Sequence, residues 1–274
     1  MLTLLRGRPA VTQQADPTPS LGAHPWLWLA GGALLFFTVP FLGTDTFGLQ
    51  PDLYYLVYFT VAVGWFLAFT FAHRAQLRPM WRHNLGWSIA IGVVVGAGIA
   101  AIVFRQVGTE HPDGLRWWFE IGWRGVVYGV VDALTLFVFP TAVAYLLMHG
   151  DRRGARRKMA FAGLALVLSL LVSTSYHLGY SEYRDADLRS PAIGTVMATV
   201  PAALTGNPLG AVVAHGIAHV SAVVHQRDGG PTHMLPPKVT EAYPSHGDGD
   251  LAAGLALVWL VATGGALTLV VRKR

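Results

Sequence analysis

Four polar side chains recur at a spacing of four residues inside an otherwise apolar stretch. They are Glu120, Arg124, Tyr128 and Asp132, and mostly glycine and valine lie between them. A helix places such positions on one slowly rotating face. Because a carboxylate and a guanidinium are costly to bury in a membrane helix, this face must point at other protein. The pattern indicates either a structural ion pair or a functional site.

Histidines form two further polar groups along the chain. His177 closes the polar stretch 173–177, and His215 and His219 lie one turn apart on a helix that we expect to begin near Pro208. The expected membrane topology places both groups at about the depth of Glu120. Three helices of a bundle can combine such side chains in one site. We therefore expect Glu120, His177 and His215 to converge.

A glutamate and histidines in such a pocket are suited to activating water. One group takes a proton from the water, and another stabilises the oxyanion that forms at an attacked carbonyl. Water bound to a divalent metal such as zinc is the second route. A site without any metal is the other possibility. The candidate metal ligands are Glu120, His177, His215 and His219. A weaker alternative is a haem between His177 and one of the other two histidines.

The composition predicts a membrane protein. Of 274 residues, 53% are hydrophobic and only 13% are charged, whereas soluble domains are roughly one quarter charged. The chain contains no cysteine, which excludes disulfides, thiolate ligands and thiol nucleophiles. The net charge of +5 comes from short basic clusters between apolar runs. Such clusters are typical of topology signals, so we expect the lipid bilayer as a partner and no nucleic acid.

The apolar runs predict an all-α bundle of about eight transmembrane helices, with seven as the alternative. Most runs reach the roughly 20 residues that a bilayer requires, but 191–205 is short enough to be re-entrant. Thirteen lysines and arginines fall on one side of these runs and six on the other. By the positive-inside rule, this multi-pass protein of the cell membrane has both termini in the cytoplasm. The runs are 26–43, 53–72, 85–104, 120–147, 159–177, 191–205, 207–225 and 251–271.

Two stretches outside these runs are polar. Residues 1–24 lack the apolar core of a signal peptide and predict a cytoplasmic tail. Residues 226–250 are rich in glycine and proline and predict an irregular outer loop. We therefore expect a single transmembrane domain over 25–274.

Three motifs resemble those of the CPBP family, the CAAX-protease and bacteriocin-processing membrane proteins. The stretch 120–125, Glu-Ile-Gly-Trp-Arg-Gly, resembles the first motif, in which two adjacent glutamates precede xxxRG. His177 is similar to the second-motif histidine, and 206–219 resembles the third motif. Phe119 stands at the first glutamate, Ser173 replaces the usual aromatic residue, and His219 stands where asparagine is expected. The resemblance covers about 115–225.

This resemblance implies an intramembrane endopeptidase that hydrolyses membrane-associated or secreted peptides. In that interpretation Glu120 and His177 activate water, and Arg124 holds Glu120 ionised. His215 and His219 would stabilise the oxyanion. Because Phe119 replaces a family glutamate, a second class stays open: a non-catalytic transporter or assembly partner whose polar residues form a structural, proton-handling or metal-handling network.

Overall fold

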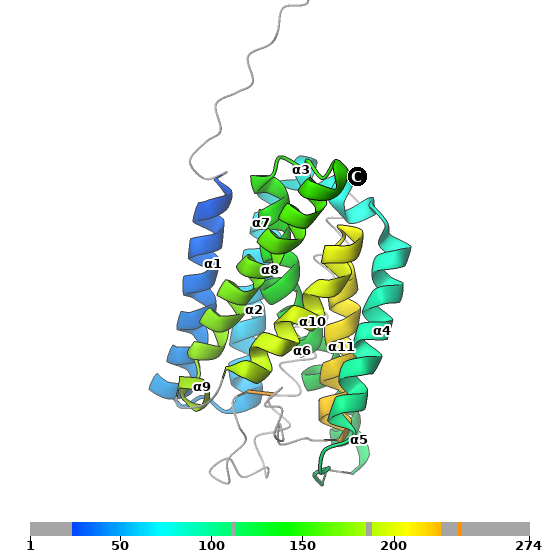
Figure 1. Ribbon diagram of the computed structural model, residues 1–274. Coiled ribbons are helices and arrows are strands. Elements are labelled where there is room, and N and C mark those ends of the chain that lie inside the picture. The colour runs from blue at the N-terminus through cyan, green and yellow to red at the C-terminus, as the bar shows by residue number, and fades with distance from the viewer. Residues whose placement is uncertain (1–23, 111–112, 185–187, 226–234, 237–274) are drawn as a thin grey trace, which may run out of the picture.

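The computed structural model describes residues 24–110, 113–184, 188–225 and 235–236, and these ranges contain helices and no strand. Five stretches are long and apolar enough to cross a membrane: Pro25–Thr46, Pro51–Ala72, Leu85–Val103, Gly114–Leu147 and Gly154–Leu178. The predicted all-helical class is therefore confirmed, and the five apolar stretches support the predicted membrane bundle (Figure 1).

The predicted count of about eight spans is reached only in part. The short run 191–205 belongs to α10 (Arg189–Thr205), and 207–225 corresponds to α11 (Leu209–His225), an apolar helix shorter than the five spans. The predicted span 251–271 and the predicted tail lie outside the described residues, apart from His24. Of the predicted outer loop, only Leu235 and Pro236 are described.

Short segments join the long helices that surround the fourth span. α1 continues into a π-helix, η2, and α3 lies across one end of the bundle (Figure 1). α5 and α9 lie at the opposite end. The elements outside the fourth span and the last two helices are α1 (Pro25–Pro40), η2 (Phe41–Thr46), α2 (Pro51–Ala72), α3 (Arg74–Arg82), α4 (Leu85–Val103), α8 (Gly154–Leu178) and α9 (Ser181–Arg184).

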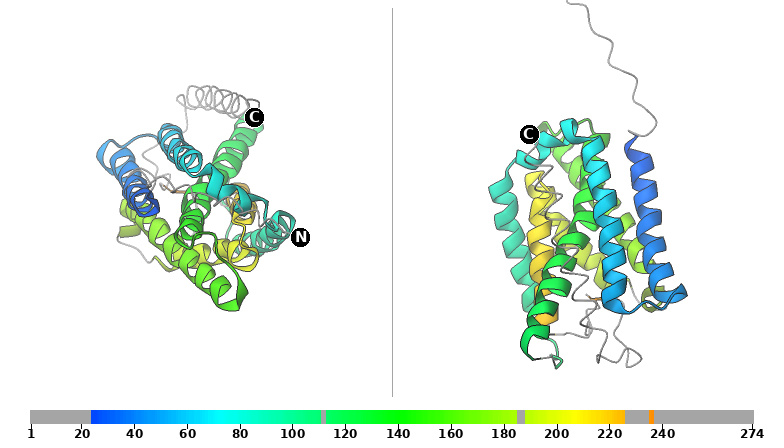
Figure 2. Two further views of the ribbon diagram at one scale, coloured as in Figure 1. Left: turned by 90° about the horizontal axis from the view of Figure 1, so that it is seen from above. Right: turned by 180° about the vertical axis from the view of Figure 1, so that it is seen from behind.

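The fourth span forms the centre of the bundle. In its most apolar window 83% of residues are buried, against at most 39% in the other four spans, and it runs through the middle of the molecule (Figure 2). Because protein surrounds it, it can carry polar side chains that lipid would not tolerate. It is built from α5 (Gly114–Glu120), η3 (Ile121–Val127), α6 (Tyr128–Ala133), η4 (Leu134–Val138) and α7 (Phe139–Leu147), of which η3 and η4 are π-helical.

Close contacts through glycine fix α11 between α4 and α6. A Cβ added at Gly92 would lie 2.2 Å from the carbonyl oxygen of Gly210, and one at Gly129 would lie 2.9 Å from the Cα of Gly216. Small residues of this kind let helix backbones approach in a membrane. The predicted helix start is confirmed, because Asn207 Oδ1 accepts a hydrogen bond from the backbone N–H of Leu209. The face of α11 that carries the histidines is thereby held against α6.

Candidate functional site

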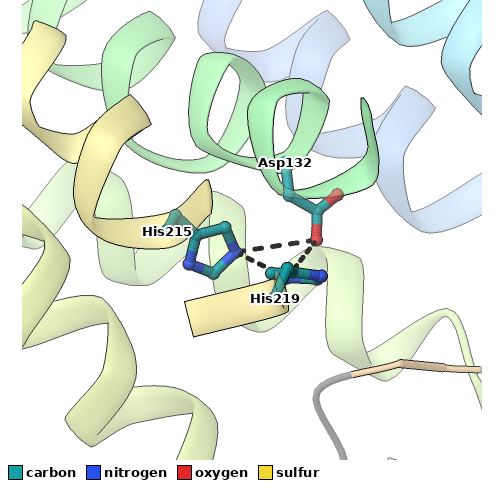
Figure 3. A group of neighbouring side chains, drawn as sticks. All are labelled: Asp132, His215 and His219. Atoms are coloured by element: carbon teal, nitrogen blue, oxygen red, sulfur yellow. Dashed lines mark hydrogen bonds and ion pairs between the residues drawn. The ribbon is translucent and has the colours of Figure 1, made fainter. Parts of the chain in front are cut away.

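Three buried or partly buried side chains, Asp132, His215 and His219, form what we call the histidine cluster. Asp132 comes from α6, and the histidines come from successive turns of α11. The two histidine Nε2 atoms lie 3.0 Å apart, and they lie 3.9 and 4.0 Å from Oδ2 of Asp132 (Figure 3). Three atoms that can each offer a lone pair thus face one point.

This triangle has the size of a zinc site. The point equidistant from its three corners lies about 2.1 Å from each, given sides of 3.0, 3.9 and 4.0 Å. Zinc binds histidine nitrogen at about 2.0–2.1 Å and carboxylate oxygen at about 2.0–2.2 Å. Three protein ligands with an open fourth position are typical of catalytic zinc sites. The histidine cluster is therefore of a size to hold a divalent metal.

The neighbours of the histidine cluster orient its groups. The hydroxyl of Tyr58 on α2 donates to Oδ1 of Asp132 at 2.9 Å, which leaves Oδ2 turned toward the histidines. The ring of Phe137 lies 5.0 Å from that of His215, and the ring of Tyr128 lies 4.8 Å from that of His219. Such outer contacts position ligands and tune the metal that they hold.

A cavity of about 360 Å³ adjoins the histidine cluster. Asp132, His177, His215 and His219 all line it, so three of the five predicted site residues meet there. Nδ1 of His177 lies 2.7 Å from the carbonyl oxygen of Ser173. Because a carbonyl only accepts, Nδ1 must carry the proton, which leaves the lone pair of the neutral ring on Nε2. The Nε2 lone pair of His177 is therefore the acceptor that this residue offers to the cavity.

The other two predicted residues belong to a second group, the ion-pair cluster of Asp52, Arg116, Glu120 and Arg124. Arg124 Nε donates to Oδ1 of Asp52 at 3.0 Å, whereas Glu120 Oε1 accepts from Arg116 Nε at 3.0 Å. Arg116 Nη2 also donates to Oδ2 of Asp52 at 3.0 Å. Glu120 and Arg124 are thus joined through residues that we did not predict, and neither is among the residues that line the cavity.

The separation of Glu120 from the histidines has a simple geometric origin. Glu120 precedes Asp132 by twelve residues, about 18 Å along a helix that rises about 1.5 Å per residue. The π-helix η3 lies between them. Its turns contain more residues than α-helical turns, so residues spaced four apart no longer stay on one face. Phe119, at the position of the family's first glutamate, lies under the Arg116 guanidinium, 5.5 Å from ring centroid to Cζ.

Sequence reasoning missed Asp132 as a site residue, although it had placed this aspartate on the same polar face as Glu120. The motif resemblance pointed to Glu120 and Arg124 at the start of that face and not to Asp132 at its end. Asp52 was missed because it opens an apolar run, where an acidic residue is an ordinary helix-start feature. Tyr58 was missed within an aromatic-rich run that gave no sign of its partner.

The chain matches no protein-family model, no curated protein and no solved structure. The CPBP resemblance is neither supported nor contradicted by relatives. The chemistry of the two clusters is therefore the basis for assigning a function.

Proposed function

We propose that the chain is an intramembrane hydrolase that activates water at a divalent metal, most simply zinc, held by Asp132, His215 and His219. The observation that carries this proposal is the triangle of ligand atoms, whose equidistant point lies about 2.1 Å from each corner. The adjoining cavity supplies room for a substrate. A metal in such a site lowers the pKa of bound water toward about 7 and polarises a carbonyl.

The residues around the cavity supply the remaining steps of an amide hydrolysis. Nε2 of His177 accepts a proton as the water oxygen bonds to the carbonyl carbon. The C–N bond then breaks, and the proton passes from His177 to the leaving nitrogen. Asp132, rather than Glu120, supplies the carboxylate of this site, and Tyr58 holds the aspartate in position.

The walls of the cavity favour a substrate that lies in the membrane. The cavity reaches the outer surface of the bundle between α4 and α10, where Ile102 and Ile193 both line it and are exposed. A substrate could enter there without leaving the bilayer. We propose a membrane-associated peptide, as the CPBP resemblance implies, because a peptide offers an amide bond within an apolar segment.

The basic residues suggest how the site is oriented. Arg74, Arg78 and Arg82 of α3 lie at one end of the bundle, as does the basic stretch 152–158 at the start of α8 (Figure 1). By the positive-inside rule we assign this end, and both termini, to the cytoplasmic side of the cell membrane. The cavity, lined by Gln106, Tyr183 and Pro191 near the opposite end, then belongs to the outer half of the bilayer.

The test combines metal analysis with cleavage of a membrane-peptide library by purified protein. Wild type should retain about one zinc per chain, and His215→Ala should lose both the zinc and at least ~10²-fold of the cleavage rate. The matched control is Glu120→Gln, which changes a buried carboxyl group in the ion-pair cluster and should keep both. Full cleavage by His215→Ala would refute the metal mechanism. Loss of cleavage by Glu120→Gln with zinc retained would return the catalytic role to Glu120.

One observation favours the second class of function. Asp132 is bonded to Tyr58, and further buried tyrosine hydroxyls bond to one another between α2, α6, α8 and the residues just after α8. A polar track of this kind could carry protons in a transporter. Zinc-bound protein that cleaves nothing but moves protons into liposomes, with Asp132→Asn inactive, would favour that function.

A further inference from the structure

A backbone carbonyl is held by two buried tyrosines beside the histidine cluster. Tyr55 donates to the carbonyl oxygen of Pro236 at 3.0 Å, and Tyr128 donates to the same oxygen at 3.2 Å. The two tyrosines come from α2 and α6, and each is at most 1% exposed. Leu235, the residue before, is buried as well. Two donors from different helices thus converge on one carbonyl oxygen.

Further hydroxyls reinforce one of these donors. Tyr180 donates to Tyr176 at 2.8 Å, and the hydroxyls of Tyr176 and Tyr128 are 2.5 Å apart. With the proton of Tyr128 in the bond to Pro236, Tyr176 can donate to Tyr128. Tyr54, 2.6 Å from Tyr180, can start the same chain. Hydroxyls that donate in one direction polarise one another, which strengthens the last bond in the series.

The carbonyl site lies next to the proposed catalytic centre. Pro236 lines the same cavity as Asp132, His177, His215 and His219. The ring of Tyr128 lies 4.8 Å from that of His219, so one residue contacts both sites. When water adds to a carbonyl carbon, negative charge develops on the carbonyl oxygen. Preorganised donors aimed at that oxygen stabilise the transition state.

We propose that Tyr55 and Tyr128 form the carbonyl-binding site for the substrate amide, and that Pro236 occupies it in the resting protein. The proposal rests on the proposed hydrolase function. In the reaction, both hydroxyls donate to the oxygen of the scissile carbonyl while water bonds to its carbon. The 235–236 segment must leave before that carbonyl can bind, so the chain's own carbonyl competes with the substrate. Each tyrosine touches the reacting carbonyl and is a catalytic residue in this scheme.

The first part of the test measures occupancy without requiring cleavage. The chain has no cysteine, so Leu235→Cys introduces a single thiol whose maleimide labelling reports release of the segment. Labelling should be slow at rest and at least about tenfold faster when an apolar peptide amide is added, since the thiol is buried only while Pro236 is bound. Leu115→Cys, at a position 88% exposed, is the control and should label at one rate throughout. Unchanged labelling at position 235 would make the contact a fixed tether and refute the proposal.

The second part measures catalysis. Tyr55→Phe and Tyr128→Phe remove a hydroxyl and keep the ring, and each should lower kcat about 10²–10³-fold with a smaller change in KM. Tyr54→Phe, at the remote end of the hydroxyl chain, should cost only a few-fold. Unchanged kcat in the first two variants would overturn the proposal. If wild type cleaves nothing but the peptide amide accelerates labelling, the carbonyl site stands and the hydrolase function fails.

Discussion

The ion-pair cluster and the histidine cluster both include side chains of the fourth span. The first pairs groups of opposite charge, whereas the second brings together groups that all offer lone pairs. In the ion-pair cluster two carboxylates alternate with two guanidinium groups at 3.0 Å, so the formal charges cancel. In the histidine cluster three atoms with lone pairs face one another. Charge matching, rather than burial or membership of a motif, separates a cluster that stabilises packing from one that is ready for a ligand.

The largest expected effect breaks the ion-pair cluster. Arg124→Leu leaves Asp52 and Glu120 with one guanidinium between them, and an uncompensated buried charge costs about 3–5 kcal/mol. The double variant Asp52→Leu/Arg124→Leu keeps the neutral Arg116–Glu120 pair and should be more stable than the single one. Thermal unfolding in detergent measures the order. A double variant that unfolds at the lower temperature would show that Asp52 is not the partner that matters.

The second prediction separates the clusters by their response to zinc. Binding to the folded state alone stabilises a protein by about 2.7 kcal/mol at a ligand concentration 100 times Kd. This stabilisation raises Tm. We expect zinc to raise the Tm of wild type and Glu120→Gln, and to raise the Tm of Asp132→Asn much less. Without zinc, Asp132→Asn should be no less stable than wild type, because a buried carboxylate has been removed. A full zinc response in Asp132→Asn would exclude the aspartate as a ligand.

The third prediction changes the distance between the two helices that carry the histidine cluster. A Cβ at Gly129 would lie 2.9 Å from Gly216 Cα and 3.0 Å from His219 Cβ. Gly129→Ala should therefore push α6 from α11, cost about 1–3 kcal/mol and weaken zinc binding. Gly122→Ala on the same span meets nothing within 4 Å and should be neutral or up to about 1 kcal/mol stabilising. Calorimetry with zinc compares the pair, and equal behaviour would contradict the assigned packing.

The smallest expected effect concerns the orientation of Asp132. Tyr58→Phe removes the hydrogen bond to Oδ1 and should weaken zinc binding roughly tenfold, the lower end for outer-shell partners. Tyr54→Phe, one turn away on α2, has its hydroxyl bonded to Tyr180 instead and serves as the control. Zinc titration of the two variants would find equal affinities if Tyr58 does not position the aspartate.

Much of the architecture was predictable because apolar length and periodicity are local properties. The spans over 53–72 and 85–104 correspond closely to Pro51–Ala72 and Leu85–Val103. The alignment of His215 with His219 follows from a spacing of four on one helix. The sequence by itself also indicated one polar face on the fourth span, with Asp132 among its members.

Only the tertiary structure decided which carboxylate meets the histidines. The π-turns of η3 and η4 alter the rotation of the fourth span, and a pattern of apolar residues does not reveal where such turns fall. Asp52, which accepts from Arg124, and Tyr58, which donates to Asp132, both come from α2, more than seventy residues away in sequence. Pairings across the bundle depend on which helices become neighbours and at what depth. For that reason Glu120 and Asp132, neighbours on one predicted face, serve two different clusters.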